Sequence, residues 1–192
     1  MRPAVFLDRD GTLVEEVPYL HDPARLVLVP GAGPALAALA AAGYALVVVT
    51  NQAGVAHGHY GEAAVGRVHH RLRALLAADG VRLDGIWYCP HHPAGVVDGY
   101  ARTCRCRKPA PGMLQEAAAT LGLDLAASYL IGNHETDVEA AVAAGATPLF
   151  VASGRGAGSA PAAGVAGFPS LQAAVLAVLA AGHVKGPGPP RP

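Results

Sequence analysis

The chain has 192 residues, which is enough for one domain with a sizeable hydrophobic core, and its formal net charge is zero. This balance of charge argues against a nucleic-acid partner or an acidic membrane surface. No apolar run approaches the roughly 18 residues of a membrane span, and the N-terminus lacks the apolar segment of a signal peptide, so we expect a soluble, cytoplasmic protein with no membrane partner. We also expect a monomer.

Short, continuous apolar runs alternate with Ala-rich stretches along the chain. Continuous apolar runs are typical of strands that are buried on both faces, and the Ala-rich stretches, several of which are followed by Gly, are typical of helices. We predict strands at 4–7, 45–49, 86–88, 129–131 and 148–151, and helices at 33–42, 62–78, 112–121, 137–144 and 170–181. This alternation predicts an α/β fold, a doubly wound parallel sheet with helices on both faces.

Residues 1–182 are expected to form a single domain. The remaining segment, 183–192, reads HVKGPGPPRP and is too rich in Pro and Gly to build secondary structure. We therefore expect it to be a disordered tail.

Polar side chains gather where the predicted strands end, and in a doubly wound sheet ligands bind at that edge. The first strand ends in Asp8 and Asp10, whose side chains point the same way in an extended chain, and Gly11 lets the chain bend after them. The other residues of this kind are Thr50, Asn51 and Gln52 after the second strand, Lys108 before a helix, and Asn133, His134 and Asp137 after the fourth strand. These groups favour a phosphoryl-transfer site at one edge of the sheet.

The chemistry follows from the residue types. One carboxylate can attack phosphorus to give an aspartyl-phosphate, and a second can protonate the leaving oxygen and later activate water. A hydroxyl and a Lys can hold the transferred oxygens, while Mg²⁺ screens the phosphate from the attacking carboxylate. The two acidic residues of DRDGT would then share a magnesium ion and a phosphoryl group.

The motifs DRDGT, the strand ending in TN, the later Lys-Pro and the GN…D run resemble, in order and spacing, the haloacid-dehalogenase superfamily of phosphatases. The resemblance covers about residues 4–151 and implies that Asp8 is the nucleophile and Asp10 the general acid/base. It implies that Thr50 and Lys108 stabilise the phosphoryl group, and that Mg²⁺ is bound by Asp8, the backbone carbonyl of Asp10 and position 133.

All three cysteines lie between residues 89 and 106, in a C-x-H pair and a C-x-C pair. Clustered cysteines in a reducing compartment more often bind metal than form disulfides, and three thiolates with one imidazole make a normal zinc set. The ligands are Cys89, Cys104, Cys106 and either His91 or His92, between which the spacing does not choose. Such a site has no open position for water, so the zinc is expected to be structural and to fix Arg107 and Lys108, which follow it.

The segments TNQAGVAHGHY, YCPHHP and CRCRKPAPGM look like the D-glycero-D-manno-heptose 1,7-bisphosphate 7-phosphatases. The resemblance implies a Rossmann-like fold with a zinc loop that includes His91, no large cap domain, and a phosphorylated sugar as substrate. It implies substrate contacts from Glu16, Val17, Pro18, Tyr19, Asn51, Gln52, Ala53, Arg107 and His134. A second substrate phosphate would explain Arg107 beside Lys108.

Two other functions remain open on the sequence. The histidinol-phosphate phosphatases share the zinc loop, and a binding protein could keep the fold and the zinc while having little activity. The family usually has Asp where this chain has Asn133, which is expected to weaken the magnesium site. Among the other histidines, we expect His69 and His70 to be solvated, and His57 and His59 to lie near the pocket, where contact with the substrate and simple exposure are both possible.

Overall fold

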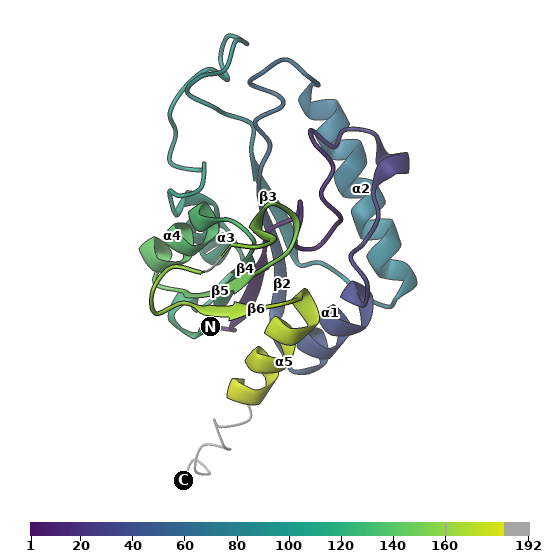
Figure 1. Cartoon of the computed structure of the whole chain (residues 1–192), viewed down its shortest axis with the longest axis vertical. Coiled ribbons are helices and arrows are strands. Elements are labelled where there is room, and N and C mark those ends of the chain that lie inside the picture. Colours follow the sequence, from purple (N-terminus) through teal and green to yellow (C-terminus); the bar gives the residue numbers. More distant parts are fainter. Residues whose placement is uncertain (160, 183–192) are drawn as a thin grey trace.

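A six-stranded parallel sheet forms the centre of the molecule (Figure 1). The computed structural model describes residues 1–159 and 161–182, and the tail predicted to be disordered lies outside them. The strands are β1 (Ala4–Leu7), β2 (Ala45–Asn51), β3 (Gly85–Cys89), β4 (Tyr129–Gly132), β5 (Thr147–Val151) and β6 (Ala166–Phe168). Their order across the sheet is β3-β2-β1-β4-β5-β6.

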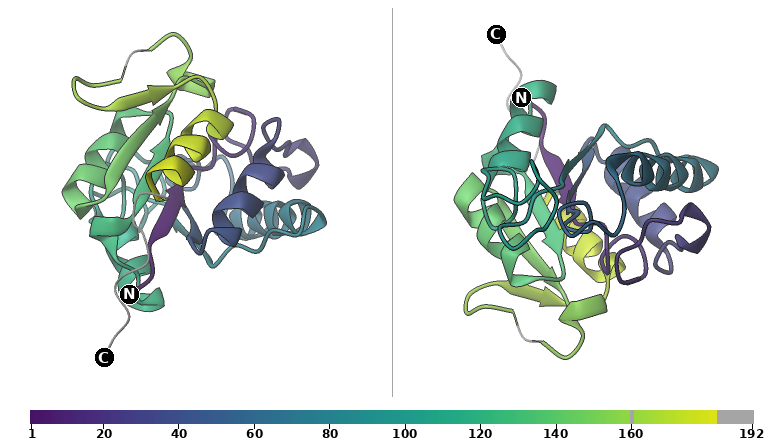
Figure 2. Two further views of the ribbon diagram at one scale, coloured as in Figure 1. Left: turned by 90° about the horizontal axis from the view of Figure 1, so that it is seen from below. Right: turned by 90° about the horizontal axis from the view of Figure 1, so that it is seen from above.

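Helices cover both faces of the sheet, as Figure 2 shows. One face carries α1 (Ala32–Ala41), α2 (Glu62–Ala78) and α5 (Leu171–Gly182), and the other carries α3 (Gly112–Leu121) and α4 (Glu135–Ala144). Successive residues of β1 enter opposite hydrophobic cores, Val5 the first and Phe6 the second, because side chains alternate along a strand. The predicted doubly wound α/β fold is confirmed.

The sequence located the main elements but not all of them. Three 3-10 helices (Pro23–Arg25, Leu125–Ala127 and Gly154–Gly156) and the edge strand β6 were not predicted. Strand β6 reads AGF, too short and too Gly-rich to give an apolar signal. Helix α4 begins at Glu135, earlier than predicted, because the His134 side chain accepts a hydrogen bond from the backbone N–H of Thr136 and caps it.

The prediction that His69 is solvated was wrong, whereas His70 is exposed as predicted. The buried positions of α2 are Ala64, Val65, Val68, His69, Leu72 and Leu76. His69 lies four residues after Val65 and three before Leu72, so the helical period places it on the buried face. The spacing carried this signal, although the residue type argued against it.

The order of the strands places the predicted site residues together. Strand β1 lies between β2 and β4, and the chain crosses from one side of β1 to the other between β3 and β4. The carboxyl ends of parallel strands at such a crossing border a crevice where ligands bind. The segments that follow β1 and β3 leave the sheet at that edge, towards the top of Figure 1.

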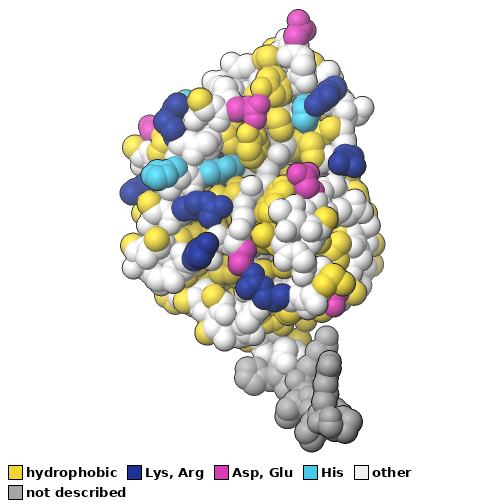
Figure 3. Space-filling view, turned by 180° about the vertical axis from the view of Figure 1, so that it is seen from behind, with side chains coloured by type: hydrophobic (Ala, Val, Ile, Leu, Met, Phe, Trp, Pro, Cys, Tyr) yellow, Lys and Arg dark blue, Asp and Glu magenta, His cyan; other side chains and the backbone are white. Residues whose placement is uncertain are grey.

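The surface mixes charges of both signs. On the face shown in Figure 3, Lys and Arg side chains are interspersed with Asp and Glu, in keeping with a net charge of zero. No helix within residues 1–159 and 161–182 has the length and apolar character needed to cross a membrane.

Candidate active site

A pocket of about 290 Å³ opens at the carboxyl edge of the sheet, between the segments that follow β1, β2, β3 and β4. The predicted site residues that line it are Asp8, Asp10, Glu16, Val17, Tyr19, Thr50, Asn51, Gln52, Ala53, Arg107, Lys108, Asn133 and His134. Pro18 is exposed and is not among the lining residues. Four separate segments of the sequence therefore converge on one pocket.

The floor of the pocket is a buried ion network around Lys108. Its Nζ donates to Oδ1 of Asp8 at 2.6 Å, to Oδ1 of Asp137 at 2.5 Å, and to the carbonyl oxygen of Val49 at 2.8 Å. All three donor positions of the ammonium are thus used by partners from β1, α4 and β2. The hydrogen bond from Lys108 to Asp8 involves Oδ1 and not Oδ2.

Burial and ion pairing shift the protonation of this network. Burial, opposed by the Lys108 ammonium, raises the pKa of Asp8 to about 7. Burial alone would lower the pKa of Lys108, but the carboxylates of Asp137 and Asp8 raise it to about 12. Lys108 is therefore charged throughout the physiological range, and a further cation beside Asp8 would favour the ionised form of that carboxyl group.

The backbone of Lys108 is held by Asn51 at the end of β2. The Asn51 amide donates to the Lys108 carbonyl at 3.0 Å, and its Oδ1 accepts from the Lys108 N–H at 3.1 Å. This pair of hydrogen bonds aligns the KP segment with the sheet. Asn51 was predicted to contact the substrate, and in the structure its amide positions the backbone of Lys108.

Asp137 is placed by the start of α4 and by a glycine. Its Oδ2 accepts from the backbone N–H of His134 at 3.0 Å, which completes a capping box. A Cβ on Gly132 would lie 2.4 Å from Cγ of Asp137, so only a glycine lets that carboxylate reach Lys108. The exposed side of α4 carries Glu135, which is not part of the network.

Asp10 lies in a different set of contacts from Asp8. Arg9 donates to both of its carboxylate oxygens, at 3.0 and 2.8 Å, and Nε2 of Gln52 donates to Oδ2 at 2.9 Å. The same Gln52 nitrogen donates to Oγ1 of Thr50 at 2.9 Å, and Tyr60 donates to Oε1 of Gln52 at 3.0 Å. Arg9 and Tyr60 were not predicted as site residues: they lie within the segments DRDGT and TNQAGVAHGHY, but the roles were assigned to other residues of those segments.

Asn133 lies where the ends of β1 and β4 meet. Its Nδ2 donates to the Ser153 carbonyl at 3.0 Å, and its Oδ1 accepts from Oγ1 of Thr12 at 3.3 Å. Gly11 has φ +81°, and a Cβ there would lie 2.3 Å from Nδ2 of Asn133 and 2.4 Å from Oε2 of Glu16. The bare backbone of Gly11 therefore lets an amide and a carboxylate approach each other at the pocket wall.

Aromatic and basic side chains form the mouth of the pocket. The ring centroids of Tyr19 and His59 are 4.1 Å apart, and those of His57 and His92 are 4.7 Å apart. His57 lines the pocket, whereas His59 is exposed and is not among the lining residues. Half-buried Arg107 donates from Nη1 to the His91 carbonyl at 3.2 Å, which ties its guanidinium to the Cys/His loop.

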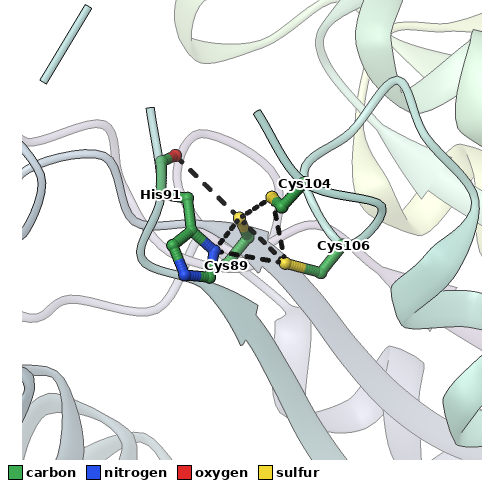
Figure 4. Close-up of side chains that lie close together, drawn as sticks. All are labelled: Cys89, His91, Cys104 and Cys106. Atoms are coloured by element: carbon green, nitrogen blue, oxygen red, sulfur yellow. Dashed lines mark hydrogen bonds between the residues drawn. The ribbon is translucent and has the colours of Figure 1, made fainter. Parts of the chain in front are cut away.

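Figure 4 shows the cluster of Cys89, His91, Cys104 and Cys106. The candidate ligand atoms all lie within 4.8 Å of one another, and the Sγ–Sγ distances are 3.2 to 3.4 Å. Nδ1 of His91 faces Sγ of Cys89 at 3.6 Å and Sγ of Cys106 at 3.5 Å. His92 instead lies beside His57, so the structure places His91 in the cluster.

Replacement of Gly132 by Ala should disturb the ion network. The new Cβ would displace Asp137 and leave Lys108 with less negative charge, so we expect the free energy of unfolding to fall by about 1–3 kcal/mol. Gly66→Ala is a matched control, because Gly66 is exposed in α2 with nothing near its added Cβ, and should stabilise the protein by about 0.5–1 kcal/mol. Urea unfolding measures both changes, and a Gly132→Ala variant as stable as the wild type would contradict this account.

Comparison with known proteins identifies the family. A family model described as HAD-hydrolase-like matches residues 105–174. The D-glycero-beta-D-manno-heptose-1,7-bisphosphate 7-phosphatase of Escherichia coli K12 is 45% identical over 154 residues, which cover 80% of this chain and 81% of that protein. The enzyme of the same name from Rhodopseudomonas palustris is 43% identical over 144 residues, covering 75% of this chain and 80% of that protein.

Solved structures agree with the sequence comparison. A D,D-heptose 1,7-bisphosphate phosphatase from B. bronchiseptica, complexed with magnesium and phosphate, has a TM-score of 0.82 and 32% identity, and the match covers 93% of this chain and 99% of that one. A protein from Mesorhizobium loti described as a HAD-like phosphatase has a TM-score of 0.85 and 37% identity, over 98% of this chain and 90% of that one. The chain therefore belongs to the D-glycero-β-D-manno-heptose-1,7-bisphosphate 7-phosphatase family of HAD-type phosphatases.

Proposed function

We propose that the chain is a Mg²⁺-dependent phosphatase that removes the 7-phosphate of D-glycero-β-D-manno-heptose 1,7-bisphosphate through an aspartyl-phosphate intermediate. The observation that carries this proposal is the buried network of Asp8, Lys108 and Asp137 at the floor of the pocket, in a chain that belongs to this family. It supplies a nucleophile with one oxygen held and the other directed to react.

In the proposed reaction Oδ2 of Asp8 attacks phosphorus, and the bond from phosphorus to the leaving sugar oxygen breaks. Asp10 gives its proton to that oxygen, and then takes a proton from the water that hydrolyses the aspartyl-phosphate. Thr50 donates a hydrogen bond to a non-bridging oxygen of the transferred group, and the charge of the Lys108 ammonium, whose three hydrogen bonds are used within the buried network, stabilises the developing negative charge electrostatically.

The oxygen donors at this edge fit a magnesium ion. The Asp8 carboxylate, the Asp10 carbonyl and Oδ1 of Asn133 are the hard ligands that Mg²⁺ prefers. Nδ2 of Asn133 is used by the Ser153 carbonyl, and Oδ1, which accepts from Thr12 with one lone pair, has a second lone pair that could bind a cation. A bound Mg²⁺ supplies charge that offsets the repulsion between the phosphate and Asp8.

Arg107 supports a substrate with a second phosphate. Its half-buried guanidinium lies in the same pocket as Lys108 and is anchored by the His91 carbonyl. A planar guanidinium suits an anion that must be held but not transferred. We propose that Arg107 binds the 1-phosphate while the 7-phosphate faces Asp8, with Glu16, Val17, Tyr19, Ala53 and His134 around the sugar.

We further propose that the chain acts as a cytoplasmic monomer with one catalytic domain in residues 1–182. The pocket and the metal cluster are both complete within one chain. Thiol groups that serve as metal ligands need a reducing compartment, which favours the cytoplasm.

The test of the proposed function is the identity of the product. Purified protein given the heptose 1,7-bisphosphate and Mg²⁺ should release one phosphate, and phosphorus NMR should show that the 1-phosphate remains on the sugar. Asp8→Asn is the control, expected to fold normally and to lose activity by at least about a thousandfold. A product that keeps the 7-phosphate, or a higher kcat/KM for histidinol phosphate, would contradict the proposal.

The Cys/His cluster is proposed to hold a structural zinc ion. Three thiolates and Nδ1 of His91 provide four ligands, which leave no open position for water. The loop they close continues directly into Arg107 and Lys108, so the zinc would limit the movement of both cations.

We expect elemental analysis to find about one zinc per purified chain. Cys104→Ser should lower the zinc content and the melting temperature, because binding of a structural metal is coupled to folding. Arg105→Ala is the matched control: Arg105 is exposed and lies between two ligands, and its loss should leave the zinc content unchanged. Wild-type protein without zinc would remove this part of the proposal.

Asn133 should make the enzyme need more Mg²⁺ than its relatives, because an amide oxygen keeps the reach of a carboxylate but loses its charge. Asn133→Asp should lower, severalfold, both the Mg²⁺ concentration for half-maximal activity and the dissociation constant of Mg²⁺ measured by calorimetry. Glu135→Gln is the control, since that exposed carboxylate lies outside the network. An unchanged Mg²⁺ dependence in Asn133→Asp would show that position 133 is not a ligand.

A further inference from the structure

Two buried polar side chains near the pocket have no part in the reaction as described so far. Arg9 is fully buried, and His69 is 8% exposed. They come from β1's carboxyl end and from the middle of α2, separated by 60 residues of sequence. Burying a guanidinium is costly unless it is paired, so its contacts indicate what it does.

Arg9 faces Asp10 with one edge and His69 with the other. Nε and Nη2 donate to the two carboxylate oxygens of Asp10, at 3.0 and 2.8 Å, and Nη2 also donates to Oε1 of Gln52 at 3.0 Å. Nη1 lies 3.2 Å from Nε2 of His69. Asp10 and His69 therefore hold the guanidinium at its two edges. The two hydrogen bonds from Arg9 also fix the orientation of the Asp10 carboxylate.

The chemistry of Arg9 determines the state of His69. A guanidinium only donates hydrogen bonds, so Nε2 of His69 must accept, and the ring must be neutral with its proton on Nδ1. Burial, with Arg9 and Arg73 adding to it, lowers the pKa of His69 to about 3. His69 is therefore a constant acceptor and not a group that titrates during the reaction.

These contacts leave Asp10 open towards the pocket only. Its carboxylate has about four lone-pair positions, of which Arg9 uses two and Gln52 a third. The side chain of Asp10 is 23% exposed and lines the pocket, whereas that of Arg9 is 1% exposed and is not among the lining residues. The remaining position is the one that can carry a proton to the leaving oxygen.

We propose that Arg9 and His69 are positioning residues for Asp10: His69 holds the guanidinium, and the guanidinium directs the free lone pair of Asp10 to the leaving oxygen. This inference rests on the proposed phosphatase function. It assigns neither residue a contact with the substrate, and both act through Asp10.

The role predicts a dependence on the leaving group. A sugar alkoxide is a poor leaving group and needs the proton from Asp10, whereas p-nitrophenolate leaves as a stable anion. Because kcat/KM reports steps up to the departure of the leaving group, a misdirected Asp10 should affect kcat/KM for a sugar phosphate more than for p-nitrophenyl phosphate. A general loss of structure would affect both esters equally.

The experiment compares His69→Leu with His69→Gln on both esters, in the full-length protein with Mg²⁺. Leu fills a similar volume without an acceptor, whereas the Gln carbonyl can still accept from Arg9. In His69→Leu we expect kcat/KM for the heptose bisphosphate to fall about tenfold and that for p-nitrophenyl phosphate to fall about twofold or less. His69→Gln should restore most of the difference, and His70→Leu, at the exposed neighbouring position, should change neither value.

Equal losses on the two esters, or no loss in a folded His69→Leu variant, would overturn the positioning role. If His69→Leu does not fold, Arg9→Lys provides the same comparison, because Lys keeps the charge but cannot form the fork. Wild-type protein that hydrolyses neither ester would overturn the proposed function itself, and this role with it. Failure of the two ideas is therefore distinguishable.

Discussion

One buried ammonium group organises the active site. Nζ of Lys108 joins the end of β1 through Asp8, the start of α4 through Asp137 and the end of β2 through the Val49 carbonyl. A buried charge is tolerated only when its partners are held in place, and removal of one partner of such a pair typically costs about 3–5 kcal/mol. The Asn51 amide and the bare backbone of Gly132 provide that support. The position of the nucleophile and the stability of the sheet edge therefore depend on the same contacts.

The loop after β3 connects this network with the Cys/His cluster. Only Arg107 separates Cys106 from Lys108, so any restraint on the cluster passes directly to the two cations that face the pocket. The cluster itself begins at Cys89, the last residue of β3, and is thus fixed to the sheet at one end. Asn51 fixes the other end through the backbone of Lys108. The loop that carries Arg107 and Lys108 is in this way held at both of its ends.

The sequence predicted what depends on local pattern. Continuous apolar runs predicted β1 to β5, and the DRDGT, KP and GN motifs predicted residues that line one pocket in the structure.

The sequence did not predict contacts that depend on tertiary packing. The Arg9–His69 pair joins β1 to α2, and no periodicity links a charged residue at the end of a strand to a helix residue so far along the chain. The helical spacing of α2 places His69 on the buried face, but the prediction of a solvated side chain was based on the polarity of histidine. The amide of Asn51 could likewise have been used for substrate or for backbone, and only the fold decides.

Two aspartates two positions apart can remain close because each has its own cation, and the two cations differ. Lys108 is a point charge that binds one oxygen of Asp8, and in the proposed reaction the other oxygen attacks phosphorus. Arg9 is a planar fork that binds both oxygens of Asp10 and fixes the direction of the remaining lone pair. The residue between the two aspartates thus neutralises one of them, since alternation along the chain turns Arg9 to the side on which α2 packs. As the proposed nucleophile, Asp8 needs one oxygen free, and Lys108 binds only the other one. As the proposed acid/base, Asp10 needs a fixed orientation, and Arg9 provides it by binding both oxygens.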